Sequence, residues 1–448
     1  WDRGKVFFDD RQVYEFNLQP DEGYANPAFI NLQQYHFENF FVERVRELQA
    51  DGAPIEIRGR NKVDAIGTHE DHVRLEVETP EGPYTLEAEW LIACDGAASP
   101  TRRMLGIDFE GRVFEDNFLI ADVIMDADFP SERWFWFDPP FNRGQSALLH
   151  KQPDNVWRID LQLGWDIDKE REKRPENVIP RLKAMLGDDV EFQLEWVSIY
   201  TFQCRRMESF RKGRVLFAGD SAHQVSPFGA RGGNGGVQDV DNLGWKLAAV
   251  ISGQADTALI ETYHEERSHG SAENILNSSR ATNFMTPKTP AEALFRSEAL
   301  RLAHDQPFAR KLLNSGRLSL PCSLEGFALQ TDGAAQVAPG HAMLDAPLTG
   351  PDGDTWLIEK AQGAFTLVGF GDVHLPDLAG LPRIGINQRA DYPCYTATHG
   401  HAIRRYGSDI AYLFRPDGHV CAVFRNPTAE DVQAAIDTAM GRALETEA

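Results

Sequence analysis

Apolar and polar positions follow two different periods along the chain, and each period predicts a different kind of element. Phe37, Phe40, Phe41 and Val45 recur at helical spacing and predict an amphipathic helix over residues 34–48. Residues 157–163 alternate strictly between apolar and polar, which predicts a half-buried antiparallel strand. The chain therefore combines helices with sheets.

The region between residues 118 and 205 has a pronounced strand pattern. We predict antiparallel strands at residues 133–137, 146–150, 157–163 and 195–201, with a helix over 180–186. In such a sheet one face packs on a core and the other face is free to cover something else.

Two short, mostly apolar runs, residues 90–93 and 214–218, predict strands of a sheet that is buried on both faces. Strands at residues 54–58 and 72–78 are expected before the first run. After the second run, a glycine-rich turn leads into a long helix over residues 238–252. This order of elements is typical of an α/β fold.

The C-terminal part of the chain has the pattern of a small, separate α/β domain. Residues 329–342 are rich in Gly, Pro, Ala and Asp and predict a linker. Strands at residues 364–368, 410–414 and 420–424 and a helix at 429–442 follow. A chain of 448 residues exceeds what one core usually serves, so two or three domains are expected.

Composition narrows the range of partners. With 45 basic and 68 acidic residues the formal net charge is -23, which disfavours nucleic acid and anionic membrane surfaces as partners. No run approaches the roughly 20 apolar residues that span a bilayer. The five cysteines form no CxxC pair, which argues against a disulfide framework and a zinc site. We therefore expect a cytoplasmic protein without a metal.

The segment over residues 213–236 carries the clearest chemical signal. A predicted buried strand ends at Gly219 and Asp220, where open α/β sheets bind ligands. Gly219 permits a close approach to the backbone, and Asp220 offers an acceptor for sugar-type hydroxyls. The glycines that follow expose backbone N–H groups at the start of a long helix, where negative charge is stabilised. On spacing alone, an ordinary glycine-rich turn is the alternative.

This segment resembles the second FAD fingerprint of the single-component flavoprotein aromatic hydroxylases, which include para-hydroxybenzoate and phenol hydroxylases. It is most similar to their hydroxyphenylpropionate and polyketide hydroxylase branch. The resemblance implies that Asp220 holds a ribityl hydroxyl of FAD and that Gly233 and Asn234 bind the pyrimidine oxygen of the isoalloxazine ring through their N–H groups. It implies further FAD contacts at Gly219, Gly232, Pro227 and Gly229, the last two beside the reactive edge of the ring.

Two further segments resemble motifs of the same family. Asp95, Gly96 and Arg102 follow the first apolar run and resemble a motif that contacts the FAD pyrophosphate and NAD(P)H. Gln34, at the start of the first helix, matches a glutamine that contacts the cofactor. The alternatives are an Asp-Gly turn beside a solvated arginine for the first segment and a polar helix cap for the second.

The resemblance also implies that the antiparallel sheet covers the substrate. Alternation over residues 134–137 places two tryptophans on one face and two phenylalanines on the other. One of these two pairs is expected to contact an aromatic ring, and we name Trp134, Trp136 and Phe228 as the candidates, with core packing as the alternative. Tyr200, on the last strand of the sheet, is the candidate to orient or deprotonate a phenol.

The activity implied is FAD-dependent monooxygenation of a small aromatic substrate. NADPH or NADH reduces FAD, O2 forms a flavin hydroperoxide, and a phenolic ring is hydroxylated. The partners expected are this substrate and O2, with a homodimer as a family-based expectation. Epoxidation or Baeyer–Villiger oxidation by the same fold, and a non-catalytic binding or scaffold protein, remain open as alternatives.

The resemblance assigns the predicted domains. Residues 1–117 and 206–328 form a Rossmann-like FAD-binding domain, and 118–205 form an antiparallel-sheet substrate domain. The linker 329–342 leads to a thioredoxin-like domain over 343–448. The family begins with a nucleotide-binding unit that contains a Gly-x-Gly-x-x-Gly turn, and no such turn opens this sequence. We therefore expect a piece of a longer enzyme.

Overall fold

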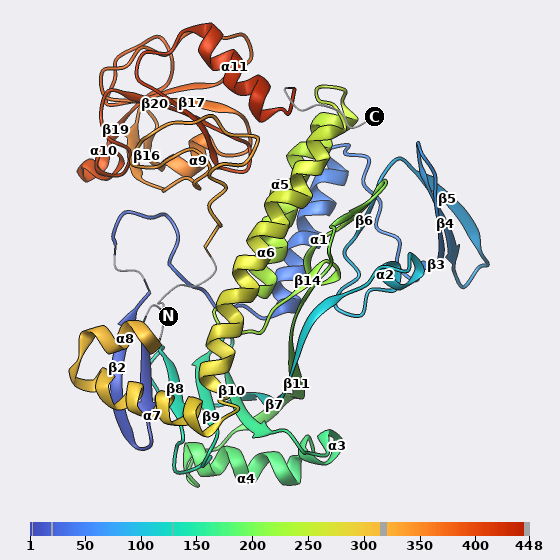
Figure 1. The fold of residues 1–448 in the computed structure, drawn as a ribbon, viewed down its shortest axis with the longest axis vertical. Coiled ribbons are helices and arrows are strands. Elements are labelled where there is room, and N and C mark those ends of the chain that lie inside the picture. The colour runs from blue at the N-terminus through green and yellow to red at the C-terminus, as the bar shows by residue number, and fades with distance from the viewer. Residues whose placement is uncertain (2, 19–20, 128, 314–319, 443–448) are drawn as a thin grey trace.

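The computed structural model describes residues 1, 3–18, 21–127, 129–313 and 320–442. Two long helices run through the middle, with a mostly antiparallel sheet at one end and a separate α/β domain near the other (Figure 1). The helices are α1 (Gln34–Ala50), α2 (Pro100–Met104), α3 (Lys169–Glu172), α4 (Pro175–Leu186), α5 (Gly232–Ile251), α6 (Ala258–Met285), α7 (Pro290–Asp305), α8 (Pro307–Leu313), α9 (Leu357–Ala361), α10 (His401–Tyr406) and α11 (Ala429–Ala439).

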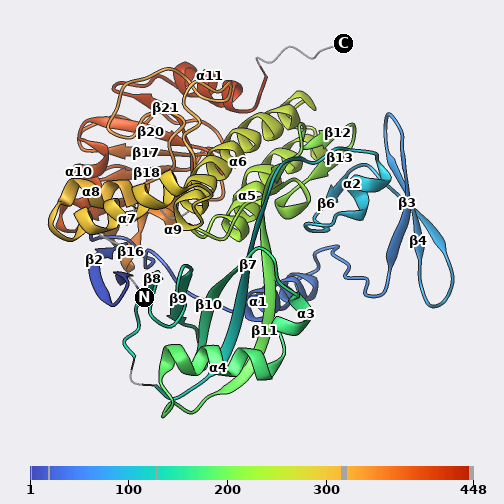
Figure 2. The same ribbon diagram turned by 60° about the horizontal axis from the view of Figure 1, so that its bottom comes forward.

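The largest sheet has eight strands in the order β14-β11-β7-β10-β9-β8-β1-β2. Helix α4 lies along one face of this sheet (Figure 2), where Val178 and Leu182 pack against Trp157 and Ile159. The alternation of apolar and polar residues supplies that buried face. The strands are β1 (Arg3–Phe8), β2 (Arg11–Asn17), β7 (Glu110–Ile124), β8 (Arg133–Phe137), β9 (Ser146–Lys151), β10 (Val156–Gly164), β11 (Gln193–Arg206) and β14 (His223–Gln224).

The two apolar runs of the sequence meet in a second, smaller sheet. Leu91 in β6 (Leu91–Ala93) pairs in parallel with Val215 in β13 (Val215–Phe217), and β12 (Arg211–Lys212) borders β13. Helices α5 and α6 pack on this sheet through a core that includes Phe217, Leu243 and Tyr263. A meander of β3 (Lys62–Thr68), β4 (Val73–Glu78) and β5 (Tyr84–Ala88) lies beside it.

The C-terminal domain contains a seven-stranded sheet in the order β16-β15-β19-β18-β17-β20-β21. Apolar clusters lie on both faces, with α10 on one and α11 on the other. Residues 329–342 have no helix or strand, yet they are tied to β21 because Thr331 and Gly340 donate backbone hydrogen bonds to Cys421 and Val420. The strands are β15 (Pro347–Gly350), β16 (Gly353–Trp356), β17 (Thr366–Phe370), β18 (Arg383–Ile386), β19 (Cys394–Ala397), β20 (Ile410–Phe414) and β21 (Val420–Phe424).

Buried charges connect this domain to the long helices. Arg415, fully buried, donates to both carboxylate oxygens of Glu266 on α6 at 2.7 and 3.0 Å. Lys246 on α5 donates to the same carboxylate at 2.8 Å. Asp417 accepts from Arg415 at 3.0 Å and from the Trp245 indole at 3.2 Å. The four charges form a neutral set, which is the condition for burying them.

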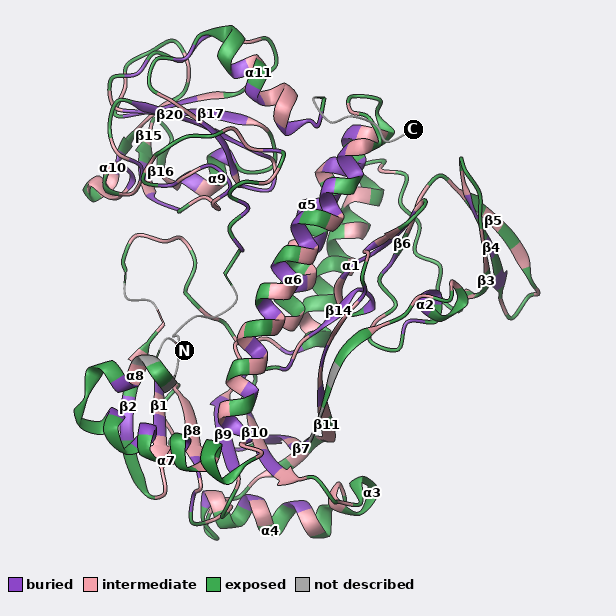
Figure 3. Cartoon of the chain, in the orientation of Figure 1, coloured by how far each residue is buried: buried purple, intermediate pink, exposed green. Residues whose placement is uncertain are grey.

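The α/β class predicted from the sequence is confirmed, and two local expectations are wrong. Residues 54–58 contain no strand. The helix predicted over residues 34–48 is present as α1, and its residues are all at least partly exposed (Figure 3). Ile92 in β6 is 41% exposed, so that strand is buried on one face only. None of the described helices combines the length and apolarity that a membrane crossing requires.

Candidate functional site

The turn after β13 is held by a buried carboxylate on α5. Gly219, at φ +62°, donates its backbone N–H to Asp239 Oδ2 at 2.9 Å. The same oxygen lies 2.7 Å from His223 Nε2, and Asp239 Oδ1 accepts from Arg267 Nε at 2.8 Å. Burial raises the pKa of Asp239, but His223 and Arg267 outweigh it, and the pKa lies below its usual value. Asp239 is thus an ionised acceptor that fixes the Gly219 turn.

The first turn of α5 packs directly against this loop. A Cβ built on Gly236 would lie 3.3 Å from the Gly219 Cα, so the two backbones meet without side chains between them. Gly233 and Asn234 are exposed in this first turn, where backbone N–H groups lack intrahelical acceptors. A Cβ at Gly233 would meet nothing within 4 Å. The helix therefore offers free N–H donors to an open surface.

Asp220 lies at the carboxyl end of β13 with its side chain exposed beside this surface. The surrounding protein nevertheless removes part of the water around the carboxyl and raises its pKa, and His223 opposes that shift. Gly229 precedes α5 with φ +92°, and Gly232 begins the helix. The strip from Gly219 to Gly236 thus combines one carboxylate acceptor with a row of backbone donors.

The second predicted motif folds against the first. Asp95 accepts from the Ser99 hydroxyl at 2.6 Å and from the Thr101 N–H at 2.8 Å, so it ties the turn to the start of α2, whose N-cap is Ser99. Arg102 is buried and donates to the Ser221 carbonyl at 2.6 Å, next to Asp220. Gly96 has φ +76°, and a Cβ there would meet nothing within 4 Å. The two motifs are thus adjacent, and Arg102 connects them, while the partners of Asp95 lie within its own motif.

Gln34 lies apart from this arrangement. It is exposed on α1 and donates to Glu38 at 2.7 Å. Its neighbour Gln33 is buried and donates to the Pro153 carbonyl at 3.1 Å. The cofactor contact predicted for Gln34 is untested and remains a prediction.

A cavity of about 280 Å³ adjoins the loop that leads into α5. Pro227, Phe228 and Ala230 from that loop form one part of its wall. Phe118 and Phe202 from the large sheet stack with ring centroids 4.5 Å apart, and Phe228 meets both rings edge-on at 5.7 and 5.2 Å. This end of the cavity is an apolar, aromatic enclosure next to the Gly219–Gly236 strip.

Most of the remaining cavity wall comes from the face of the large sheet opposite α4, and residues 29–32 before α1 and Met285 of α6 complete it. In the strand register, Arg133 pairs with His150 and His150 with Arg158 across β8, β9 and β10. Two residues along the strands, Phe135, Leu148 and Asp160 form the next row on the same face, and all six residues line the cavity. We call Arg133, His150, Gln152, Arg158 and Asp160 the polar end.

The structure distributes the predicted substrate contacts over two faces. Phe228 lines the cavity, and so does Phe135. Trp134 and Trp136 lie on the other face of β8, packed in the core with α4, and neither is among the lining residues. Tyr200 is 45% exposed, with its ring 5.6 Å from Phe202, and is not among the lining residues either. Strand alternation predicted two faces but did not say which one meets the cavity.

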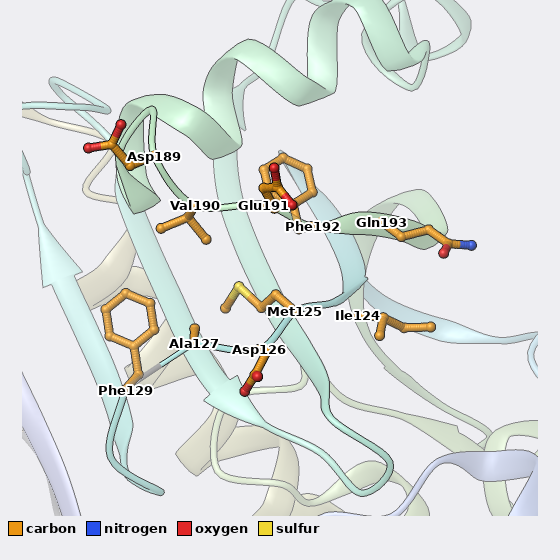
Figure 4. Close-up of a pocket in the computed structure, with 10 residues that line it drawn as sticks. All are labelled: Ile124, Met125, Asp126, Ala127, Phe129, Asp189, Val190, Glu191, Phe192 and Gln193. Atoms are coloured by element: carbon orange, nitrogen blue, oxygen red, sulfur yellow. The ribbon is translucent and has the colours of Figure 1, made fainter.

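A second hollow, of about 790 Å³, lies at the far end of the large sheet. It is formed where β7 ends and where the α4–β11 connection runs, and Phe129, Met125 and Phe192 line it together with acidic side chains (Figure 4). None of its lining residues belongs to the Gly219–Gly236 strip. Within the described ranges, no cluster of three or more His, Cys, Asp and Glu side chains is arranged to hold a metal.

The residues present fit the flavin end of FAD. An isoalloxazine ring needs a flat, open backbone surface with N–H donors near its pyrimidine oxygen, and the first turn of α5 supplies both. A ribityl chain needs a hydroxyl acceptor, which Asp220 supplies. The cavity lined by aromatic side chains lies next to this surface.

Comparisons with known proteins agree with this geometry. The FAD binding domain family matches residues 17–278. The 3-(3-hydroxy-phenyl)propionate/3-hydroxycinnamic acid hydroxylase of Shigella sonnei (strain Ss046) is 31% identical over 313 residues, which are 69% of this chain and 56% of that protein. The chain thus spans little more than half the length of the curated relatives it matches.

Solved structures extend the similarity to nearly the whole chain. OxyS anhydrotetracycline hydroxylase from Streptomyces rimosus is 26% identical, with a TM-score of 0.64 over 91% of this chain and 79% of that one. The flavin-dependent monooxygenase PieE, solved with FAD and substrate, has a TM-score of 0.77 over 99% of this chain and 86% of that one. At 19% identity the second comparison shows the fold alone.

Proposed function

Because the chain belongs to the FAD binding domain family, we propose that it is the larger part of an FAD- and NAD(P)H-dependent monooxygenase that hydroxylates a small aromatic substrate. One observation carries the proposal, namely that two features of the site lie next to each other. An aromatic cavity adjoins the Gly219–Gly236 strip, and Phe228 and Pro227 of the same loop line it. The hydroxylase relative from Shigella sonnei supports this reaction class.

The chain's own residues supply positioning and charge. Asp220 accepts a hydrogen bond from a ribityl hydroxyl, and the α5 N-terminus stabilises negative charge on the pyrimidine side of the ring. Phe118, Phe202 and Phe228 pack around the substrate ring and exclude water from the reacting edge. FAD, when bound, supplies transfer of electrons from NAD(P)H and activation of O2, which protein side chains cannot perform.

The proposal extends to the organisation of the protein. The C-terminal domain over residues 343–448 is proposed to be thioredoxin-like, in a structural or dimer-contact role, since its cysteines form no CxxC pair. All five cysteines of the chain are free thiols, which is in keeping with a reducing cytoplasm. A homodimer is proposed as the assembly, and sedimentation of the full-length protein tests it.

The first experiment is the visible absorption spectrum of the purified full-length protein, followed by NAD(P)H oxidation with a panel of phenols. A bound flavin, oxidation stimulated by substrate, and one atom from labelled O2 in a phenolic product are expected. An epoxide or a lactone as the product would replace hydroxylation by the corresponding alternative reaction. A protein that binds no flavin would refute the proposed function.

Asp220→Ala tests the flavin contact. Loss of one hydrogen bond to a charged acceptor corresponds to about 1.5–3 kcal/mol, so the dissociation constant for FAD should rise by roughly 10- to 100-fold. Titration of the apoprotein with FAD by flavin fluorescence measures this change. Asp188→Ala, at an exposed position in the α4–β11 connection, is the matched control and should leave FAD affinity unchanged. Equal affinities for both variants would contradict the contact.

We propose that Tyr200, whose ring lies 5.6 Å from the cavity-lining Phe202, orients or deprotonates the phenol. Burial, then Asp220 and Cys204, raise its pKa, so the side chain is a neutral hydroxyl at neutral pH, which favours orientation of the phenol by a hydrogen bond over its deprotonation. Tyr200→Phe should then lower kcat by roughly 10-fold with FAD content unchanged, because one hydrogen bond to the phenol is lost. Single-turnover measurements of product formation test this, and a full rate in the variant would remove the role.

A further inference from the structure

A coil over residues 21–33 connects the C-terminal domain with the wall of the cavity. It contains no helix or strand and ends where α1 begins. Its first residues contact the C-terminal domain, and it then passes to the large sheet, where residues 29–32 line the cavity of about 280 Å³ (Figure 1). We call residues 21–33 the strap.

Arg405 on α10 binds the first residues of the strap. Its guanidinium donates to the Glu22 carbonyl at 2.6 Å and to the Gly23 carbonyl at 2.7 Å. The guanidinium carbon lies 4.0 Å from the centroid of the Tyr24 ring. Hydrogen bonds from a charged donor are stronger than neutral ones, and the stacked ring adds a cation–π contact. One side chain of the C-terminal domain thus holds three successive residues of the strap.

Further contacts fix the position of this end of the strap. Asp345 Oδ2 accepts the Ala25 N–H at 2.9 Å, and Arg405 also donates to the Asp345 carbonyl. Gly23 has φ +83°, and a Cβ on it would lie 2.8 Å from the His401 ring. The strap therefore approaches α10 so closely that residue 23 must be a glycine.

The other end of the strap is bound where β9 leads into β10. The Asn31 amide donates to the Lys151 carbonyl at 2.7 Å, and the Gln33 amide donates to the Pro153 carbonyl at 3.1 Å. These two carbonyls flank Gln152 of the polar end. The strap is thus tied to the C-terminal domain at one end and to the large sheet at the other.

The strap covers the end of the cavity that is farther from the Gly219–Gly236 strip. Arg158 of the polar end pairs with Asp122 on β7. Phe118, which meets the Phe228 ring edge-on, lies four residues from Asp122 on the same strand. At about 3.3 Å per residue, this places the polar end about 13 Å along the strand from Phe118. The strap and the strip therefore bound opposite ends of the cavity.

The exposure of the lining residues identifies the strap as the boundary between the cavity and solvent. On the sheet side, Leu148 and His150 are 3% and 8% exposed. Ile30 of the strap lines the same cavity and is 67% exposed. A side chain that meets both the cavity and bulk water lies at a mouth. Displacement of the strap would therefore open the cavity at its polar end.

We propose that the strap is a lid over the cavity and that Arg405 of the C-terminal domain is its latch. Small molecules enter and leave at the polar end when the strap is released, while the opposite end stays in contact with the Gly219–Gly236 strip. The C-terminal domain thereby acquires a role in access to the cavity. This role holds for any small molecule that the cavity binds, so it does not depend on the proposed reaction.

Hydrogen exchange of the full-length protein, followed by mass spectrometry of peptides that cover residues 21–33, tests the latch. Arg405→Met keeps most of the apolar stem and removes the donors, so the strap amides should exchange faster by about tenfold or more. Arg404→Met is the matched control, because Arg404 is exposed and donates to the His399 carbonyl within its own domain. With that variant the strap amides should exchange as in the parent.

A thiol placed in the cavity tests the lid. Leu148→Cys puts a cysteine on the cavity wall, and its reaction with methyl methanethiosulfonate, a small thiol reagent, reports how often the cavity opens. Combined with Arg405→Met, this labelling should be faster by about tenfold or more, and combined with Arg404→Met it should be unchanged. Mass spectrometry of the peptide that contains residue 148 separates this thiol from the five native cysteines.

Equal exchange and equal labelling with and without Arg405→Met would overturn the proposal, and so would an equal effect of Arg404→Met. Faster exchange with unaltered labelling would overturn it too, because Arg405 would then hold a segment that does not close the cavity. If circular dichroism shows that Arg405→Met is misfolded, Tyr24→Ala takes its place, since it removes the ring stacked on Arg405 and should accelerate both processes. Neither measurement needs flavin or turnover, so failure of the proposed function leaves this test intact.

Discussion

Glu266→Gln is expected to lower the free energy of unfolding by about 3–5 kcal/mol, because it removes one partner from a buried ionic network. Glu266 is fully buried and accepts from Arg415 at 2.7 and 3.0 Å, from Lys246 at 2.8 Å and from Asn242 at 2.6 Å. Burial raises its pKa, but Arg415 and Lys246 outweigh this and hold the pKa well below its usual range. The amide would leave two cations facing only Asp417.

The substitution of Glu266 affects more than the hydrogen bonds of its own carboxylate. Its partners Arg415 and Asp417 belong to the C-terminal domain, whereas Lys246 belongs to α5, so the variant also weakens the contact between the domains. Urea denaturation followed by tryptophan fluorescence measures the change. Glu265→Gln, one residue earlier and exposed, is the matched control and should stay within about 0.5 kcal/mol of the parent. Similar midpoints for the two variants would show that the network contributes little.

The sequence predicted elements where periodicity and burial coincide. The helix expected over residues 34–48 is observed as Gln34–Ala50, and the apolar run 214–218 contains β13. Non-local pairing was not predictable in the same way. The N-terminal hairpin β1–β2 joins the large sheet through parallel pairing with β8, more than a hundred residues away, although the sequence assigned this segment to the FAD-binding domain. A local pattern of apolar and polar residues does not identify a partner strand that lies so far away in the sequence.

The site divides along similar lines. Gly219, Asp220 and Asn234 could be identified from the sequence because their chemistry depends on backbone conformation at a strand–helix turn. Arg133, His150 and Asp160 could not, because three separate strands bring them together. A partial signal existed in Arg158 and Asp160, two charges on the same parity of a strictly alternating strand. Such charges on a strand that lies over a core indicate a face that is not packed against apolar side chains.

Asp239 lies next to the Gly219–Gly236 strip, and the sequence did not single it out. Asp239→Asn is expected to affect both stability and FAD binding. Asp239 is fully buried and is the shared acceptor for Gly219, His223 and Arg267. Its neutral amide leaves the Arg267 guanidinium buried without a counter-charge, which should lower the free energy of unfolding by about 3–5 kcal/mol. The sequence carried one indication of this role, because Asp239 is a charged residue on the apolar side of the helix predicted over residues 238–252.

The flavin effect follows from the same geometry. Gly219 owes its orientation to the bond with Asp239, and Asp220 is the next residue, so a loosened turn should misplace the ribityl acceptor and weaken FAD binding. Thermal unfolding of the apoprotein and FAD titration at a temperature where the variant is folded measure the two effects separately. Asp241→Asn, on the exposed side of α5, is the control and should preserve FAD affinity. Reduced stability with unaltered FAD affinity would restrict Asp239 to a structural role.

The pH dependence of the stability difference identifies the charge as its cause. Because the folded protein lowers the pKa of Asp239, its ionised form stabilises the fold above the unfolded pKa of about 3.9, and this contribution is lost as the pH falls through the lower folded value. The asparagine variant has no such titration. The gap in unfolding free energy between the parent and Asp239→Asn should therefore be constant from about pH 5 to 7 and narrow below about pH 4. A gap that stayed constant down to pH 2 would show that hydrogen-bond geometry, rather than the charge of Asp239, holds the Gly219 turn.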